Sequence, residues 1–503
     1  MRTAPASRLG LIPVGAMSSR MASFLTITFA AVGSLTVAYL VAGGRWYLAI
    51  GLLLVVPVTV LVNRFPLSVI LFWLLVQPFV VDIAAGGSLR KLFWVVHRAL
   101  PPFAVVLILI TAAMGLRRRP LPRLGWAEVM MGGYIIATLI SIVYTSDTVL
   151  ASMYHLYDRV FVPMCLYLII RLIDPDEETL RALVPALVFL VVSQAVFGML
   201  SWYNPEALPD TWLGRAGERT TGSLKSVSAY TTTLIFGALI LVHHAMGTER
   251  RGVARVGLLG AGAVAAYMVF LSFSRASWLA ALVVAMGLLF VYPRLVLKVA
   301  VVAVPVLLIA LSTGVIQDQL TFAEDRVSSE VSDESALSRL PIVLASVRMF
   351  EERPVTGFGF GNFDRFDREF QGQVGDLVVP EKDHASHNLY MTLLAEQGLI
   401  GLVLFIGPVF WWLVRLPRAA RNLPRSGFRS RQFLFILWLV ITAHVIVNNF
   451  SNMRSTFGLG IWWITLGLIA IVTVQGLTPG GGSPAAGEVH EERELQPGPR
   501  GQE

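Results

Sequence analysis

The sequence predicts an all-α membrane protein, a polytopic bundle of about 12–14 transmembrane helices with a large outward-facing loop that contains short helices. Of the 503 residues, 55% are hydrophobic and only 14% are charged, and the mean hydropathy is +0.68. A soluble domain carries about 25% charged residues. Apolar runs of about 17–25 residues recur along the chain, and each is long enough to cross a bilayer as a helix.

We count about fourteen apolar runs of this length. Two neighbouring pairs, 46–63 with 66–82 and 276–292 with 295–313, are joined by very short turns and leave the count open. The runs lie near 23–42, 46–63, 66–82, 101–116, 127–144, 155–171, 180–201, 228–246, 256–273, 276–292, 295–313, 388–414, 432–450 and 456–475.

Both ends of the chain are expected to lie outside the helical domain. Residues 1–22 form a basic segment, and the apolar run after it is too long for a signal peptide and lacks a clear small-residue cleavage site. Residues 476–503 are rich in Gly, Pro and Glu, and we expect a disordered tail. The sequence thus predicts one transmembrane domain over residues 23–475, including a polar loop at 314–387.

Basic residues predict the orientation of this domain. The densest basic turns fall on one side of the bundle, and positive charge in short loops marks the cytoplasmic side. Both termini join that side, and the turns largely account for the net charge of +8. Nucleic-acid binding is not expected, because such charge would sit on a soluble module. The turns hold Arg117–Arg119 with Arg123, Arg250–Arg251 with Arg255, and Arg415–Arg431.

Two polar segments interrupt the series of apolar runs, and both are expected on the side opposite the basic turns. The first, about 202–227, contains Arg219. The second, about 314–387, shows an amphipathic helix pattern from Ser338 to Phe350 and then a glycine-rich turn after Pro354. It ends at His387, so a histidine and several arginines are expected at one face of the membrane.

The most informative motif is H-N-x9-G-x-x-G, formed by His387, Asn388, Gly398 and Gly401. At about 100° per residue, Gly398 lies about 20° around a helix from His387 and Gly401 about 40° the other way. We expect one helix face with the histidine at its mouth and two glycines below, which let a neighbouring helix approach closely. A helix-end histidine above an ordinary packing groove fits the same spacing.

These motifs resemble those of the O-antigen ligase/O-antigen polymerase superfamily of bacterial polytopic membrane glycosyltransferases. The histidine motif matches completely, and residues 339–359 are similar to the family's loop helix and its P-x-x-G-x-G turn. Phe273–Trp278 resembles the family's S-R signature. Arg219–Ser223 resembles its upstream arginine segment, although Lys225–Ser228 replaces the family's Asn-Pro-Asn-like stretch. The resemblance covers roughly residues 150–475.

The resemblance implies an inverting glycosyltransferase of the bacterial inner membrane. Because no Cys/His cluster in the sequence suggests zinc, we expect the reaction to need no metal, and we expect no cofactor. Its donor would be a glycan on polyprenyl diphosphate, presented at the outer face, and its acceptor a hydroxyl of a glycan, lipid or protein. His387 would be the general base, since its unperturbed pKa of about 6.5 suits proton transfer. Arg219, Arg275 and Arg339 would bind the diphosphate. Asn388, Gly398 and Gly401 would support the histidine.

Other interpretations of the same residues remain open. An arginine at a helix end often reaches only to lipid phosphate, and Arg339 also fits a solvated helix face. Asp174-Pro175-Asp176 imitates a metal-binding D-x-D motif but fits a helix cap better. A lipid-linked saccharide transporter would show mid-membrane polar groups and internal repeats. Ligase, polymerase and protein O-oligosaccharyltransferase differ only in the acceptor.

Overall fold

The computed structural model describes residues 32–65, 67–80, 88–115, 117, 120–209, 212, 219–247, 252–314, 317–328, 340–371, 387–451 and 455–478. These residues form helices and connecting turns, with no strand among them, so the predicted all-α class is confirmed. The predicted N-terminal segment 1–22 and Arg339 lie outside the described residues. So does the predicted tail 476–503 apart from residues 476–478, of which Gly476 and Leu477 end α21.

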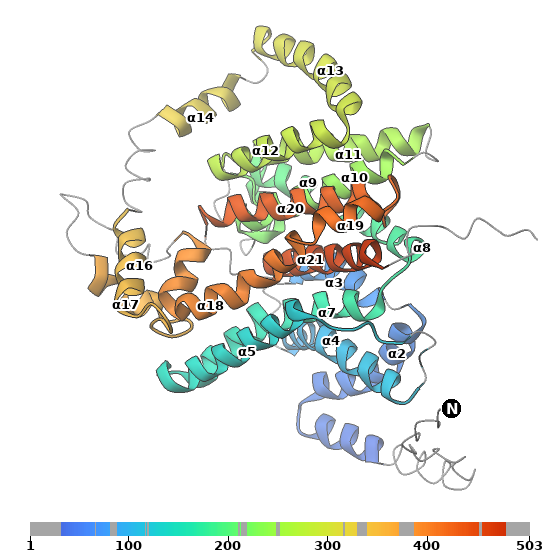
Figure 1. The fold of residues 1–503 in the computed structure, drawn as a ribbon, viewed down its shortest axis with the longest axis vertical. Helices are drawn as coiled ribbons and strands as arrows, with labels where there is room; N and C mark the ends of the chain where they lie inside the picture. The colour runs from blue at the N-terminus through green and yellow to red at the C-terminus, as the bar shows by residue number, and fades with distance from the viewer. Residues whose placement is uncertain are drawn as a thin grey trace, which may run out of the picture.

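The long helices lie side by side across the view of Figure 1. After a short helix at Val32–Ala42, the main ones are α2 (Trp46–Arg64), α3 (Ser68–Val80), α4 (Ser88–Ala113), α5 (Trp126–Thr145), α7 (Val162–Ile173), α9 (Leu183–Tyr203), α10 (Val227–Ala245), α11 (Val253–Phe270), α12 (Arg275–Val291), α13 (Pro293–Ser312), α18 (Leu389–Leu413), α20 (Arg431–Asn448) and α21 (Thr456–Leu477). The shorter elements are α6 (Val149–Leu156), η1 (Tyr157–Phe161), α8 (Glu177–Arg181), η2 (Pro205–Ala207), η4 (Gly222–Leu224), α14 (Gln317–Ser328), α16 (Leu340–Glu352), α17 (Phe363–Gln371) and α19 (Leu416–Asn422).

Seven helices in the described part of the chain are long and apolar enough to cross a membrane. Five further apolar helices there are shorter. Each run of the two closely spaced pairs forms a helix of its own. The first pair forms α2 and α3, and the second forms α12 and α13. The predicted amphipathic helix of the long loop is α16. The chain is therefore a multi-pass helical membrane protein, as the composition predicts.

The antiparallel pair α5 and α18 defines the two ends of the bundle. At one end a Cβ on Gly125 would lie 3.9 Å from Trp411 Nε1, and in the middle Gln397 Nε2 donates to Thr138 Oγ1 at 3.1 Å. The other end holds the last turn of α5 and the first turn of α18. We call it the His387 end; the opposite one is the His243 end, after the last turn of α10.

The described basic turns lie together at the His243 end. Arg117 donates to the carbonyl of Leu172 at 3.3 Å, and Arg171 donates to the carbonyl of Arg123 at 2.8 Å. His243 Nε2 bonds to the carbonyl of Gly427 at 3.0 Å, within the basic segment 415–431. Partial burial also lowers the pKa of Arg117. These turns thus share one end, opposite His387. Arg118, Arg119, Arg250 and Arg251 lie outside the described residues.

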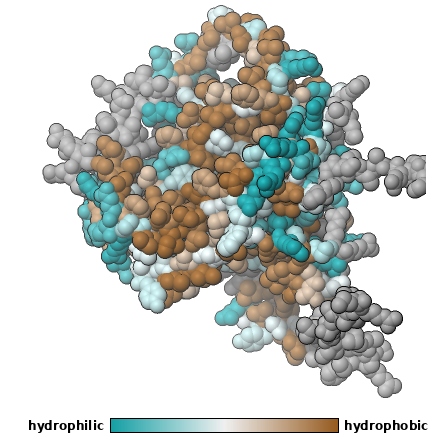
Figure 2. All heavy atoms as spheres, viewed as in Figure 1, coloured by the Kyte–Doolittle hydropathy of each residue, from teal (hydrophilic) through white to brown (hydrophobic). Residues whose placement is uncertain are grey.

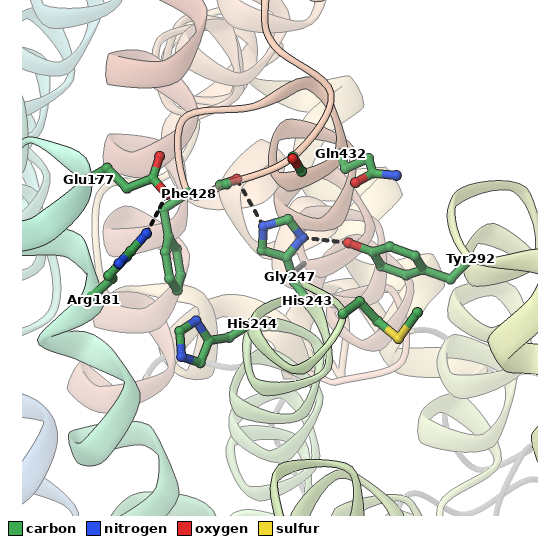
Figure 3. A pocket seen from close by; sticks show the side chains of 11 residues that line it. Glu177, Arg181, His243, His244, Gly247, Tyr292, Phe428 and Gln432 are labelled. Carbon is green, nitrogen blue, oxygen red and sulfur yellow. Dashed lines mark hydrogen bonds and ion pairs between the residues drawn. The ribbon is translucent and has the colours of Figure 1, made fainter. Parts of the chain in front are cut away.

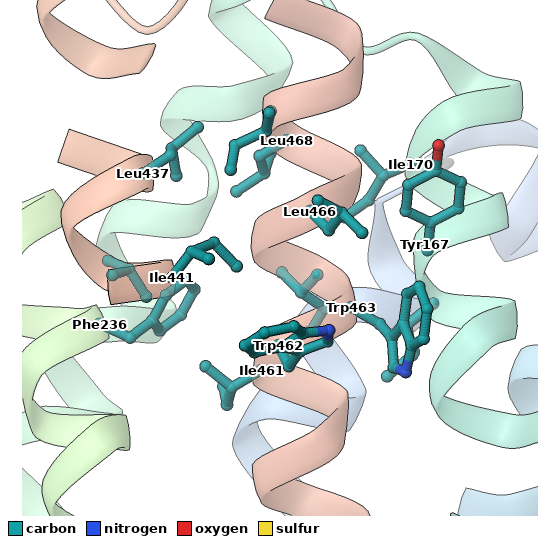
Figure 4. Close-up of a cluster of buried hydrophobic side chains, with 14 of the residues drawn as sticks. Tyr167, Ile170, Phe236, Leu437, Ile441, Ile461, Trp462, Trp463, Leu466 and Leu468 are labelled. Atoms are coloured by element: carbon teal, nitrogen blue, oxygen red, sulfur yellow. The ribbon is translucent and has the colours of Figure 1, made fainter. Parts of the chain in front are cut away.

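Helix α21 forms the centre of the core. Of its most apolar window, 94% is buried inside the protein, against 17% for α11 at the periphery. Tyr167 of α7, Phe236 of α10 and Ile441 of α20 lie around it, and Tyr167 meets Trp463 of α21 edge to face (Figure 4). The outer face is apolar too: Figure 2 shows a broad hydrophobic area between hydrophilic patches at its left and right sides. A core surrounded by apolar surface is the pattern of a helix bundle in lipid.

Candidate active site

Asn388 fixes the start of α18 and the position of His387 beside it. Its Oδ1 accepts hydrogen bonds from the backbone N–H groups of Tyr390 (2.9 Å) and Met391 (3.0 Å). Its Nδ2 donates to the carbonyl oxygen of Asn449, at the end of α20, at 3.1 Å. His387 is half-buried and takes a left-handed conformation, with φ of 49°. The cap and the bond to Asn449 therefore tie the start of α18, one residue after His387, to the end of α20.

The predicted common face of His387, Gly398 and Gly401 does not form. His387 precedes the N-cap of α18 and is not helical. The helix itself breaks at Gly398, where φ is 62° and ψ is −161°. The prediction assumed one uninterrupted helix, and the break removes the angular relation between the three residues.

The turn at residues 354–359 fills the break in α18. Leu399 N–H donates to the carbonyl of Pro354 (2.8 Å), and Ile400 N–H to that of Val355 (3.4 Å). In return, the N–H groups of Phe358 and Gly359 donate to the carbonyls of Ala395 (2.9 Å) and Glu396 (2.7 Å). The turn thus supplies hydrogen bonds to backbone groups that the broken helix leaves open.

Glycine is required on both sides of this contact. A Cβ on Gly398 would lie 2.7 Å from Thr356 N, and one on Gly357 would lie 2.5 Å from Gln397 N. Both glycines have positive φ, 62° and 65°, which disfavours other residues as well. At Gly401 a Cβ would lie 2.6 Å from Gln397 Oε1. Gly357 of the P-x-x-G-x-G turn and Gly398 of the G-x-x-G segment therefore form one interlock, whereas Gly401 leaves room for Gln397 of its own helix.

The same turn is anchored to the last turns of α5. Phe360 N–H donates to Ser141 Oγ at 3.1 Å, and Asn362 Nδ2 donates to the carbonyl of Thr145 at 3.1 Å. Glu396, only 1% exposed, accepts from Phe363 N–H at the start of α17 (3.3 Å). Helices α16 and α17 therefore stand at the His387 end, at the left of Figure 1.

The segment of Arg219 lies against the end of α11, and Arg275 follows the turn between α11 and α12. Thr220, next to Arg219, donates its N–H to the carbonyl of Leu271 and its hydroxyl to that of Met268, both at 3.3 Å. Arg275 is the first residue of α12, after the N-cap Ser274. Arg219 is half-buried and Arg275 is exposed.

Both arginines lie at the His387 end. His243 bonds to Tyr292 Oη after α12 (2.6 Å) and to the carbonyl of Gly427 before α20 (3.0 Å), so α12 and α20 are antiparallel. Arg275, at the start of α12, therefore lies at the same end as Asn449, which binds Asn388. The structure brings Arg219 next to the turn of Arg275 and places His387 at the same end of the bundle.

Two polar residues lie deeper in α20, one turn apart. His444 is fully buried, and its Nδ1 donates to the carbonyl of Val440 at 3.0 Å. Within the described chain, His444 Nε2 and Asn448 Oδ1 have no hydrogen-bond partner. Asn448 precedes Asn449, whose carbonyl binds Asn388. The sequence left open whether these residues line a cavity or join helices. Among the described residues, none forms a hydrogen bond that would join these two atoms to a neighbouring helix.

A buried ion pair joins two residues that the sequence does not single out. Arg98 of α4 binds Asp158 in η1, with 3.0 Å between Nη2 and Oδ2, and Thr456 Oγ1 donates to the same carboxylate at 2.9 Å. Arg98 is 8% exposed and Asp158 is 7% exposed. The signal was Asp158 itself, a carboxylate inside an apolar run. The pair joins α4, η1 and α21 near the His387 end.

A pocket of about 190 Å³ lies at the His243 end (Figure 3). His243 and His244 line it, with Arg181, Glu177 and Gln432 around them. His243 Nε2 faces a carbonyl and must carry the proton, so Nδ1 accepts from the hydroxyl of Tyr292. The pocket is far from the predicted site residues.

The predicted cap at the D-x-D-like segment is confirmed. Asp176 Oδ1 accepts from the backbone N–H of Thr179 at 3.0 Å, at the start of α8. Asp174 instead pairs with Arg429. The two carboxylates are therefore used in local contacts at the His243 end.

Comparison with known proteins supports the predicted resemblance. Residues 260–406 match the family model described as O-antigen ligase. The matched region contains Arg275, the 354–359 turn and the whole H-N-x9-G-x-x-G motif, whereas Arg219 lies before it. No curated protein matches the chain. The resemblance to the O-antigen ligase/polymerase superfamily is thus confirmed on the segment that carries the histidine motif.

Proposed function

We propose that this chain, whose residues 260–406 match the O-antigen ligase family, moves a glycan from a polyprenyl-diphosphate donor to an acceptor hydroxyl at the outer face of the inner membrane. One observation carries the proposal: Arg219, Arg275 and His387 lie at one end of the bundle, opposite the described basic turns. A base and two cations at one membrane face are the groups that this transfer needs.

His387 acts as the general base. It takes the proton of the acceptor hydroxyl while that oxygen attacks the anomeric carbon of the donor sugar. The bond from this carbon to the phosphate oxygen breaks, and polyprenyl diphosphate leaves with the bonding electron pair. Attack from the opposite side inverts the configuration. The Asn388 cap and its bond to Asn449 hold His387 in place, which a positioned base requires.

The arginines bind the diphosphate and stabilise the charge that grows on it. Guanidinium groups stay protonated and bind phosphate oxygens in a two-pronged arrangement. Arg275 has a further advantage, because it stands in the first turn of α12, where backbone N–H groups and the helix dipole favour an anion. Arg219 joins it from the segment held by Thr220. Arg339 is a third candidate from the loop.

The acceptor would approach from the side of α16 and α17. These helices stand over the His387 end and are fixed to α5 and α18 by the 354–359 turn. A ligase, a polymerase and a protein O-oligosaccharyltransferase would share the donor site and differ in this region. The donor chemistry is therefore common to all three proposals, and the acceptor is the point at which they separate.

The test is deletion of the gene in the source organism, followed by analysis of surface glycans and lipid-linked precursors. We expect a surface glycan to be lost or shortened while its polyprenyl-linked precursor accumulates. The kind of truncation identifies the acceptor, since a ligase leaves the acceptor bare and a polymerase leaves a single repeat unit. Unchanged glycans and precursors would contradict the proposed function.

A further inference from the structure

An apolar groove runs along the periphery of the bundle between α9 and α11. Its volume is about 530 Å³, and all of its lining residues are Val, Ala, Gly, Leu or Met. Val188, Val192 and Val196 belong to the α9 wall, and Gly257 and Ala261 to the α11 wall. From Val184 to Met199 the groove follows α9 for about 22 Å, at 1.5 Å per residue.

The groove ends directly beneath the arginine segment. At the His387 end α9 and α11 close together, since a Cβ on Gly198 would lie 3.4 Å from Met268 Sδ. Met268 is one helical turn beyond Val264, the last α11 residue in the groove. Its carbonyl oxygen accepts the hydroxyl of Thr220, the neighbour of Arg219. The α11–α12 turn, with Arg275, follows directly.

We infer that this groove holds the polyprenyl chain of the donor while Arg219 and Arg275 hold its diphosphate. The inference rests on the proposed function and assigns its donor a second contact region. A hydrocarbon layer is about 30 Å thick, so one leaflet spans about 15 Å. A groove of about 22 Å reaches past the midplane. It therefore suits a chain longer than one leaflet rather than the acyl chain of an ordinary phospholipid.

The groove positions the polyprenyl chain but contributes little hydrophobic free energy of binding. Lipid tails are as apolar as valine side chains, so moving a chain from the bilayer into the groove gains mainly van der Waals packing. Its effect is to restrict where the chain lies and to keep the attached diphosphate at the arginines. Occupation of the groove should therefore lower the KM for a long-chain donor.

Two glycines of α11 allow a matched test. Gly257 lines the groove, and Gly260 does not. A Cβ at either position would have no atom within 4 Å, so both accept a larger side chain. Gly257→Leu should fill the groove, whereas Gly260→Leu adds the same group to another face of the same helix.

The first measurement is photo-crosslinking in vesicles. The probe is a long-chain polyprenyl monophosphate with a diazirine about 16 Å along the chain from its phosphate, at the depth of Gly257. We expect crosslinks to α9 and α11 in the natural protein and in Gly260→Leu, and a yield lower by roughly five-fold (about 1 kcal/mol) in Gly257→Leu. Equal yields in the two variants, or labelling confined to other helices, would overturn the inference.

The second measurement is transfer with donors of different chain length. Gly257 lies eleven residues, about 16 Å, from Met268, so a short prenyl chain does not reach it. Gly257→Leu should raise the KM of a long-chain donor by roughly five-fold and change that of a short-chain donor little. An equal rise for both donors would contradict the groove. Crosslinking needs no turnover. Labelling of the groove without any glycan transfer would therefore contradict the proposed function but not the binding of a polyprenyl chain in the groove.

Discussion

Leu399 donates its backbone N–H to the carbonyl oxygen of Pro354 at 2.8 Å, across the break in α18 at Gly398. This bond joins a membrane helix to a turn that lies more than forty residues earlier in the chain. It couples the position of α16 and α17 to the first half of α18, which begins beside His387. The two glycine motifs therefore act together, and damage to either should disturb the same region.

Gly398→Ala should destabilise the protein and lower transfer. A non-glycine residue at the φ of 62° and ψ of −161° of Gly398, a region that essentially only glycine adopts, costs roughly 1–3 kcal/mol, and the added Cβ would also overlap the backbone of the 354–359 turn. Thermal unfolding in detergent measures the effect. The control is Gly132→Ala in α5, where a Cβ meets no atom within 4 Å and alanine favours the helix. If both variants unfold at the same temperature, the interlock is not important for stability.

Arg275→Lys should reduce transfer by roughly ten-fold although the charge is kept, because lysine cannot bind two phosphate oxygens in a planar fork. The donor KM measured with purified protein tests this. Arg294→Lys, an exposed arginine at the His243 end, serves as the control and should leave KM unchanged. Full activity of Arg275→Lys would exclude a two-pronged contact.

Asp158→Asn should destabilise the protein by about 3–5 kcal/mol, because Arg98 would remain buried without its counter-charge. The comparison is Asp147→Asn, which breaks an ion pair with Arg365 in which both side chains are at least half exposed. That change should cost less than about 1 kcal/mol. Equal loss of thermal stability in the two variants would show that Asp158 is not essential to the packing of α4, η1 and α21.

Ser426→Cys and Glu369→Cys test the orientation of the bundle. Ser426 lies in the basic segment at the His243 end, and Glu369 is exposed on α17 at the His387 end. The natural Cys165 is buried and can be replaced by Ala. A membrane-impermeant thiol reagent should label Glu369→Cys in intact cells once any outer membrane is made permeable. Ser426→Cys should react only after the inner membrane is broken. The reverse pattern would place His387 on the cytoplasmic side.

Much of the helical framework was predictable because each membrane helix needs a continuous apolar run. The predicted run 127–144 corresponds to α5 (Trp126–Thr145), and 432–450 corresponds to α20 (Arg431–Asn448). Helix α4 begins at Ser88, well before the predicted 101, since Arg90, Lys91 and Arg98 lower the local hydropathy. Hydropathy counts Arg98 as a charge, although Asp158 of another segment neutralises it, so the start of α4 was missed.

The site was predictable in its residue types but not in its geometry. The helical period places Gly398 and Gly401 relative to His387 only if α18 is continuous, and the break depends on a turn distant in the sequence. The Asn388–Asn449 bond spans 61 residues and the Arg98–Asp158 pair spans 60. Contacts of this range leave no periodic signal, so only the fold reveals them.

The most direct test of the proposed chemistry is the transfer rate of purified His387→Ala with a polyprenyl-diphosphate-linked glycan. Loss of the general base should lower turnover by about 10²–10⁴-fold, while thermal stability and donor binding are kept. His155→Ala, a half-buried histidine of α6 at the same end, is the matched control and should retain its activity. Turnover of His387→Ala at the rate of the natural protein would contradict the role of His387 as the base.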